Sequence, residues 1–254
     1  MFFDTHAHYD DKAFDADRGA LLESLAESGV ELIIDPGCTL ESSRKAIELS
    51  KKYPFMYAAV GIHPEELGDY TEEALRETEK LAAHPKCAAI GEIGLDYYWD
   101  DTHKQEQKEL FIRQAEMAVR LGKPVIVHDR EAHGDSMDIV KSVKGLTGVF
   151  HCYSGSAEMA KELLKLGWYL GFDGPVTYKN ARKTLEVLEI CPPDRILIET
   201  DSPYLSPVPM RGKRNHSGNL EYIAAKIAEV KGESFDNICR ITLENGKRLF
   251  NIQP

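Results

Sequence analysis

The sequence has 254 residues, of which 43% are hydrophobic and 29% charged, a globular composition that excludes a disordered or fibrous protein. Asp and Glu number 42 against 31 Lys and Arg, for a net charge of -11. This balance argues against a broad basic surface for duplex nucleic acid, although it leaves room for a local anion site.

Short apolar runs alternate with longer segments in which apolar residues recur every three or four positions, the pattern of βα units. Eight strands are predicted, at residues 2–8, 32–37, 55–64, 87–96, 124–130, 148–155, 168–175 and 196–203. Helices between them are predicted at residues 20–29, 41–53, 104–122 and 157–167. The strand cores are nearly continuous apolar runs, as in a parallel sheet that is covered on both faces.

Eight such units predict a (β/α)8 TIM-type barrel, an α/β fold in which residues 1–254 form a single domain. A doubly wound open sheet is the weaker alternative. Residues 234–250 predict one extra amphipathic helix, packed on the outside. The irregular segment 204–218 is rich in proline and basic residues and follows the eighth strand. Loops longer than about 12 residues are usually functional.

Histidine and carboxylate side chains interrupt the predicted strands near their carboxyl ends, which form the active-site face of an α/β barrel. They are His6, His8, His63, Glu92, His128, His151 and Asp201. Burying these polar groups costs free energy unless each finds a partner, and a metal centre provides such partners. His6 and His8 are two residues apart, so both side chains leave the same face of a strand.

Nitrogen and oxygen ligands without thiolate suit Zn, Mn, Co, Fe or Mg. The predicted ligands are His6, His8, Glu92, His128, His151 and Asp201. They exceed the needs of one tetrahedral ion, so we expect two divalent ions. Glu92 and Asp201 are also assigned catalytic roles: Glu92 as a bridge between the ions, and Asp201 as a ligand that takes the proton from a bound water. Such a centre activates water for hydrolysis.

Basic residues near the same face are expected to bind substrate. Arg211, Lys213 and Arg214 lie in the segment 204–218 and would localise a phosphate in an otherwise acidic protein. The alternative is that these three residues form an ordinary solvent-exposed surface that binds no substrate. Arg130 lies two residues beyond His128 and could hold the same anion, to which His63 could donate a hydrogen bond.

Other polar and aromatic residues near this face are given supporting roles. Asp4 and Asp96 are expected to orient ligand histidines or to cap helices. The aromatic run at 97–99 is interpreted first as a packed rim and second as a platform for a base. Cys152 follows His151, so strand alternation predicts that its thiol turns away from the site into the core.

The five cysteines are scattered singly and form no Cys-x-x-Cys pair, which predicts reduced thiols. No run of about 18 apolar residues occurs, and the first residues lack the basic and apolar stretches of a signal peptide. We therefore expect a cytoplasmic protein without a membrane partner, and nothing in the sequence implies an obligate protein partner.

The sequence resembles the TatD-type metal-dependent deoxyribonucleases of the amidohydrolase superfamily. The motifs that carry the resemblance are DTHAH at 4–8, GIHP at 61–64, GEIGLDYY at 91–98, PVIVHDRE at 124–131, HCYSG at 151–155, ETDSPYL at 199–205, RGKRN at 211–215 and NGKRLF at 245–250. They span essentially the whole chain. One departure is His216-Ser217, which stands where the family usually has Glu-Pro.

The resemblance implies the same six ligands for two divalent ions, which would be Mg, Mn or Zn, with Glu92 in the bridging place. It also implies hydrolysis of phosphodiesters as a 3′–5′ exodeoxyribonuclease, with the ends of single-stranded DNA as the nucleic acid substrate. Some members act on other esters, including mischarged aminoacyl-tRNA.

Two other functions remain open. The same metal centre could hydrolyse a small cyclic amide, a lactone or another ester, which the acidic net charge slightly favours. A metal-binding or partner-docking protein without catalysis is disfavoured, because structural metal sites are usually closed and four-coordinate.

Overall fold

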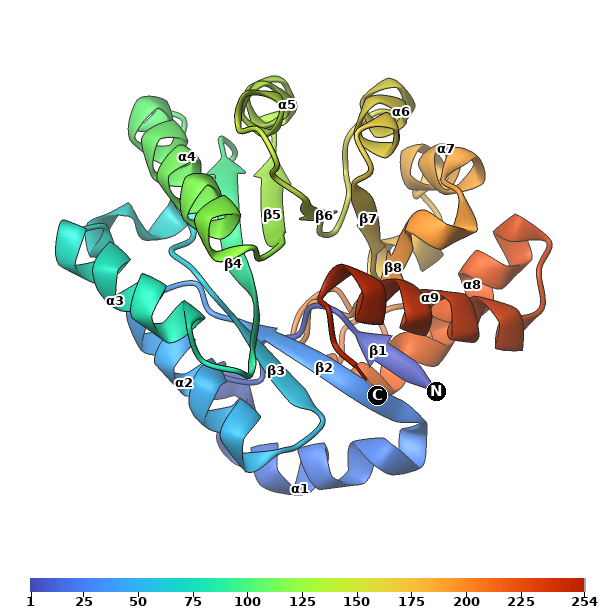
Figure 1. Ribbon diagram of the computed structural model, residues 1–254. Coiled ribbons are helices and arrows are strands. Elements are labelled where there is room, and N and C mark those ends of the chain that lie inside the picture. The colour runs from blue at the N-terminus through green and yellow to red at the C-terminus, as the bar shows by residue number, and fades with distance from the viewer. Residues whose placement is uncertain (254) are drawn as a thin grey trace. The chain divides into compact units, whose positions relative to one another are not determined.

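A computed structural model describes residues 1–253, and its strands and helices alternate along the chain (Figure 1). The strands are β1 (Phe2–Asp4), β2 (Val30–Pro36), β3 (Met56–Val60), β4 (Cys87–Asp96), β5 (Val125–Arg130), β6 (Gly148–Phe150), β7 (Tyr169–Phe172) and β8 (Ile196–Ile198). The α-helices are α1 (Arg18–Ser24), α2 (Leu40–Lys52), α3 (Glu72–Ala82), α4 (Lys104–Leu121), α5 (His133–Ser142), α6 (Ala157–Lys165), α7 (Arg182–Ile190), α8 (Leu220–Lys231) and α9 (Phe235–Leu249). All eight predicted strands are present.

The chain divides into two compact units. Unit 1 contains Met1–Asp35 and the described residues from Cys152 on, and unit 2 contains Pro36–His151. The single domain predicted for residues 1–254 stays a prediction. Within residues 1–253, no helix has the length and apolar character needed to cross a membrane.

In unit 1 the strands follow the order β7-β8-β1-β2, and all their pairings are parallel. The pairing of β8 with β1 continues past their ends, where Thr5 N donates to Ile198 O at 3.3 Å and Ala7 forms a bridge with Ser202. The first and last strands of the chain are therefore neighbours. An open doubly wound sheet leaves them apart, so this pairing confirms the predicted (β/α)8 barrel fold.

In unit 2 the strands follow the order β3-β4-β5-β6, again in parallel. Gly94 on β4 pairs with His128 on β5 and has a φ of +148°. A Cβ atom at Gly94 would lie 1.9 Å from the backbone oxygen of His128. Only glycine permits this close approach.

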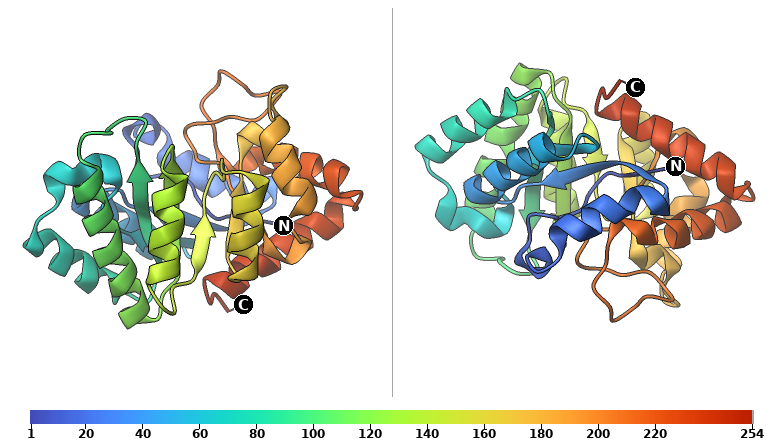
Figure 2. Two further views of the ribbon diagram at one scale, coloured as in Figure 1. Left: turned by 90° about the horizontal axis from the view of Figure 1, so that it is seen from above. Right: turned by 90° about the horizontal axis from the view of Figure 1, so that it is seen from below.

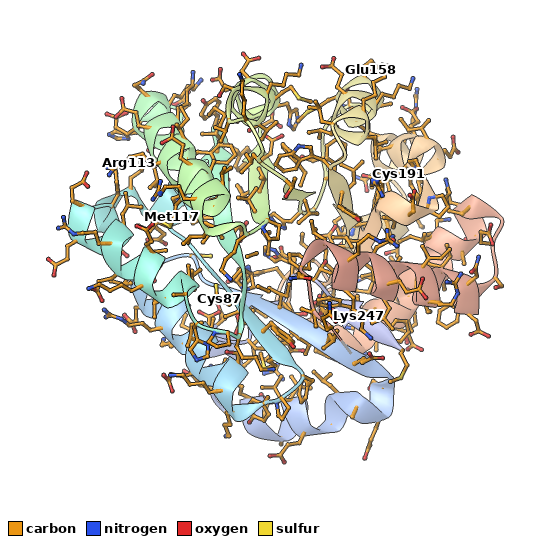
Figure 3. The ribbon with its side chains drawn as sticks, viewed as in Figure 1. Cys87, Arg113, Met117, Glu158, Cys191 and Lys247 are labelled. Carbon is orange, nitrogen blue, oxygen red and sulfur yellow. The ribbon has the colours of Figure 1, made fainter. Side chains whose placement is uncertain are left out.

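The predicted extra helix is confirmed as α9, which packs against β1 and β8 and runs beside α8 (red in Figure 2). Ser234 caps its N-terminus by accepting a hydrogen bond from Asn237 N. Asn245 donates to the backbone oxygen of Ile196 at 2.8 Å. Lys247, labelled in Figure 3, pairs with Glu31.

Several strands are shorter than predicted at their carboxyl ends. The expected strands 2–8, 55–64, 148–155 and 196–203 end at Asp4, Val60, Phe150 and Ile198. Beyond these points the backbone bonds irregularly, and Pro64 begins a 3₁₀ segment, η3 (Pro64–Asp69). The shortening places most of the predicted ligands on loops, which the strands position.

Candidate metal centre

Three predicted ligands converge in unit 1, past the ends of β1 and β8. His6 and His8 bring their Nε2 atoms within 3.1 Å of each other. Asp201 Oδ1 lies 3.6 Å from His6 Nε2 and 3.5 Å from His8 Nε2. Two imidazoles and a carboxylate at this spacing can share one ion. We call these three residues the unit 1 cluster.

Backbone hydrogen bonds fix the two loops that carry the unit 1 cluster. Asp201 N donates to His6 O at 2.9 Å, and His8 N donates to Ser202 O at 2.7 Å. Asp201 has a φ of +54°, a left-handed conformation that Asp and Asn adopt more readily than most residues. The backbone therefore aims the three side chains at one another.

Asp4 braces these loops from β1, where it is fully buried. Its carboxylate accepts hydrogen bonds from Thr200 N at 3.0 Å and Thr200 Oγ1 at 2.6 Å, and a longer one from His6 N at 3.4 Å. Burial raises the pKa of Asp4 to about 7, while hydrogen bonds from Ser217 and Thr200 act in the opposite direction. Asp4 thus supports the ligands through their backbone.

The other three predicted ligands meet in unit 2. Glu92 Oε1 lies 2.8 Å from His128 Nδ1 and 2.7 Å from His151 Nε2, and the two nitrogens are 3.2 Å apart. We call Glu92, His128 and His151 the unit 2 cluster. The register of β4 against β5 shifts between Ile90 and Ile93, a stretch that contains Glu92, and such bulges re-aim side chains beside active sites.

Asp96 fixes the orientation of the His128 ring. Asp96 Oδ2 lies 2.9 Å from His128 Nε2. Burial of Asp96 disfavours its ionised form, but hydrogen bonds, chiefly from His128, hold the pKa of Asp96 below its ordinary value. With Nε2 committed to Asp96, His128 presents Nδ1 to Glu92. A carboxylate behind the second ring nitrogen is the usual support for a metal-ligating histidine.

His63 lies against the unit 2 cluster rather than apart from it. Its Nε2 is 3.5 Å from Glu92 Oε1, and its ring centroid is 4.4 Å from that of His128. Burial, followed by the charge of His128, lowers the pKa of His63 to about 4. Because His63 Nδ1 accepts a hydrogen bond from Glu65 N, the neutral ring carries its proton on Nε2 and donates toward Glu92.

The donor chemistry of both units fits divalent ions. In the unit 1 cluster, and in the set of His63, Glu92 and His128, one donor atom of each residue lies within 4.8 Å of the other two. These donors are imidazole nitrogens and carboxylate oxygens, which suit Zn, Mn, Fe and Mg.

The predicted substrate-binding residues fall into different environments. Arg214 forms two hydrogen bonds to the Asp17 carboxylate, at 2.8 and 2.6 Å, and a third to Ala13 O. Arg214 therefore anchors its loop near the start of α1. Arg211 lies over the Tyr178 ring at 4.2 Å, and Lys213 Nζ lies 4.0 Å from the Met210 sulfur.

Arg211 and Lys213 line a hollow of about 480 Å³ in unit 1, together with Tyr178 and Tyr204. Among residues 1–253, no carboxylate oxygen lies within 4 Å of either cation. Tyr204 N donates to Asp201 O at 2.8 Å, so one wall of the hollow is joined to the loop of the unit 1 cluster. The hollow can accept an anion there.

The chain is similar to TatD-related and metal-dependent hydrolases over almost its whole length. The family described as TatD-related DNase matches residues 3–251. The chain belongs to the TatD-related DNase family. An uncharacterized metal-dependent hydrolase of Bacillus subtilis, YabD, is 45% identical over 99% of this chain and 100% of its own length. The crystal structure of YjjV, a TatD homologue from Escherichia coli, covers 99% of this chain and 98% of its own, with a TM-score of 0.93 and 32% identity. The family is one of metal-dependent hydrolases with a (β/α)8 barrel.

The segment that departs from the usual TatD-type motif is nonetheless anchored at its end. Asn215 Nδ2 donates to the backbone oxygens of Thr200 and Tyr204, both at 2.8 Å. His216 Nδ1 accepts a hydrogen bond from Gly218 N, and Ser217 N donates to the Tyr9 hydroxyl. In this TatD family member, the His216 ring thus makes a local contact, and Ser217 is joined to the Tyr9 hydroxyl through both its backbone N and its Oγ.

Two cysteines, Cys152 and Cys38, lie near predicted ligands. Strand alternation does not place Cys152, because β6 ends at Phe150 and Cys152 has a φ of +42°. Burial and then the charges of Asp173 and Asp201 raise the pKa of its thiol, so the side chain lies near the unit 1 cluster. Cys38 Sγ lies 3.8 Å from Glu92 Oε2. Cys38 follows the carboxyl end of a predicted strand, and this position could have indicated that it lies near the site.

We expect metal binding to this TatD family member to release protons from His128. Burial lowers the pKa of His128, but the hydrogen bonds that its ring donates to Asp96 and Glu92 outweigh burial and raise the pKa to about 9. His128 is then protonated at pH 7.5 in the metal-free protein, whereas His63 is neutral. An ion must displace that proton, so calorimetry in buffers of different ionisation enthalpy should show release of about one proton from His128.

The apparent metal affinity should rise with pH up to about 9, because deprotonation of His128 no longer opposes binding above its pKa. Asp96→Asn removes the negative charge that favours the protonated ring, so this variant should release fewer protons at pH 7.5. Equal proton release by the variant and the wild type would contradict this assignment.

Proposed function

We propose that the chain is a divalent-metal-dependent 3′–5′ exodeoxyribonuclease that acts on the ends of single-stranded DNA in the cytoplasm. The main support is the hollow beside the Asp201 loop, in which Arg211 and Lys213 have no carboxylate partner among residues 1–253. In a chain with a net charge of -11, two such cations beside a hydrolytic centre favour an anionic substrate such as a phosphodiester.

In this proposal the chain takes two divalent ions, one at the unit 1 cluster and one at the unit 2 cluster. When bound, the ions would lower the pKa of the attacking water and offset charge on the phosphodiester. Asp201 takes the proton of that water on its carboxylate. Asp96 accepts a hydrogen bond from His128 Nε2, which would leave Nδ1 to hold an ion. The bridging role of Glu92 and a substrate contact by His63 stay predictions.

Arg211 and Lys213 hold the substrate phosphate in this proposal. Arg214 orients the loop through Asp17. In unit 2, the buried His63 ring lies with its Nε2 3.5 Å from Glu92 Oε1.

The direct test is release of mononucleotides from 3′-labelled single-stranded DNA by metal-stripped protein, with and without added Mg or Mn. Metal-dependent release in order from the 3′ end supports the proposal. No release with either ion would reject it and direct the search to aminoacyl-tRNA esters and small cyclic substrates.

Charge reversal of the hollow distinguishes a nuclease from a hydrolase of neutral esters. We expect Arg211→Glu with Lys213→Glu to lower kcat/KM for single-stranded DNA by about a hundred-fold or more, because repulsion replaces two phosphate contacts. The negative slope of log affinity against log salt concentration should become shallower by about 0.7 for each lost phosphate contact.

The matched control is Lys165→Glu with Lys183→Glu, which makes the same change in net charge at exposed positions of α6 and α7. This pair should leave DNA cleavage nearly unchanged. If the reversed hollow cleaved DNA as fast as the control, Arg211 and Lys213 would have no part in substrate binding.

A further inference from the structure

Two large aromatic side chains lie exposed directly after β4, in unit 2. Tyr98 is 57% and Trp99 63% exposed. Their ring centroids are 4.9 Å apart and the rings are nearly perpendicular, at 86°. These rings therefore do not form the packed rim that was the first interpretation of the sequence.

Cations are interleaved with these rings. The Arg130 guanidinium lies 4.1 Å from the Tyr98 ring centroid and 5.5 Å from that of Trp99. Lys104 Nζ lies 4.5 Å from the centroid of Tyr97. No carboxylate oxygen of residues 1–253 lies within 4 Å of the Arg130 guanidinium. Exposed aromatic rings beside unneutralised cations are the surface that single-stranded nucleic acids use, with bases on the rings and phosphates on the cations.

The Asp96 carboxylate connects this aromatic surface to the unit 2 cluster. Asp96 Oδ1 accepts hydrogen bonds from Tyr98 N and Trp99 N, both at 2.9 Å, while Oδ2 lies 2.9 Å from His128 Nε2. One buried side chain therefore fixes both the backbone of the aromatic pair and the ring of a predicted metal ligand. A base held on the pair would have a defined position relative to His128.

We propose that Tyr98 and Trp99 form a stacking platform for one unpaired nucleobase of the substrate, and that Arg130 contacts an adjoining phosphate. The proposal rests on the proposed nuclease function and adds to it a requirement for a base near the cleaved end.

Intrinsic fluorescence can test the platform directly. The sequence has two tryptophans, Trp99 and Trp168, and Trp168 is buried at 2% exposure. A bound base should therefore quench mainly Trp99. The probe is a phosphorothioate oligothymidylate, which resists cleavage, and its control is an abasic phosphorothioate strand of equal length and charge. We expect quenching by the first strand and little by the second.

Steady-state kinetics provide the second test. Trp99→Ala should raise KM for single-stranded DNA about five- to one-hundred-fold, the loss that follows removal of one base–aromatic stack, with kcat little changed. Trp99→Tyr should restore most of the affinity, and an abasic strand should be cleaved equally by wild type and Trp99→Ala. Leu166→Ala, at another exposed apolar position, is the matched control.

The outcomes separate the two proposals. If the wild type releases nucleotides but Trp99→Ala has an unchanged KM and the abasic strand quenches equally, the platform is rejected while the nuclease stands. If oligothymidylate alone quenches Trp99 but no DNA is cleaved with Mg or Mn, base binding is supported and the nuclease is rejected.

Discussion

Asp201→Asn should lower kcat about a thousand-fold or more and leave the fold intact. The carboxylate faces His6 Nε2 and His8 Nε2, so the amide removes both the charge of a predicted ligand and the proposed proton acceptor. Asn is the substitution of choice because it tolerates the left-handed backbone at this position. Hydrolysis of single-stranded DNA, metal content and circular dichroism would be measured together.

Asp138→Asn, at an exposed position of α5, is the control and should retain the wild-type rate. Loss of turnover with an unchanged spectrum in Asp201→Asn would place Asp201 in the chemistry. Turnover within a few-fold of the wild type would remove Asp201 from the mechanism.

Loss of a group that only supports a metal ligand weakens metal binding by roughly 10–100-fold. Glu92 is itself a predicted ligand, so Glu92→Gln should weaken ion binding at the unit 2 cluster by more than this. Turnover should fall with it. Glu92 Oε1 lies within 2.8 Å of nitrogens of both His128 and His151, and it is buried. The neutral amide keeps the volume of the side chain but removes the only charge between the two imidazoles within this cluster. The pKa of His128 should also fall, because Glu92 helps to raise it.

Metal content by mass spectrometry and binding stoichiometry by calorimetry test the Glu92 prediction. Glu66→Gln, an exposed carboxylate of η3, should bind metal like the wild type. A Glu92→Gln protein that kept its full metal content and rate would show that Glu92 is neither a ligand nor a catalytic group.

The barrel could be predicted from the sequence because its signals are local. Each strand is a short apolar run, and each helix has its own periodicity, so existence and order follow from neighbouring residues. The pairing of β8 with β1 depends instead on contacts such as Thr5 to Ile198, 193 residues apart. The order of the strands in the chain does not by itself predict this pairing. It is expected only once a barrel fold is assumed.

Strand ends and side-chain partners were harder to predict, because they also depend on contacts between residues far apart in the sequence. Nothing near Arg214 in the sequence reveals Asp17, which lies 197 positions away and holds it. Nor does the sequence around His63, which is predicted to contact substrate, reveal that its ring packs against His128. Alternation failed for Cys152 because the strand had already ended at Phe150. Tertiary contacts decide each of these cases.

The division of the chain also has a consequence for biosynthesis. Unit 2 is one continuous segment, so every residue of its cluster has been synthesised once His151 is added. The unit 1 cluster joins His6 and His8 to Asp201, and a nascent chain must hold its first strand without its final neighbour while nearly 200 residues are added. Ribosome-bound chains that stop before Asp201 therefore contain an incomplete unit 1 cluster, whatever metal the cell supplies.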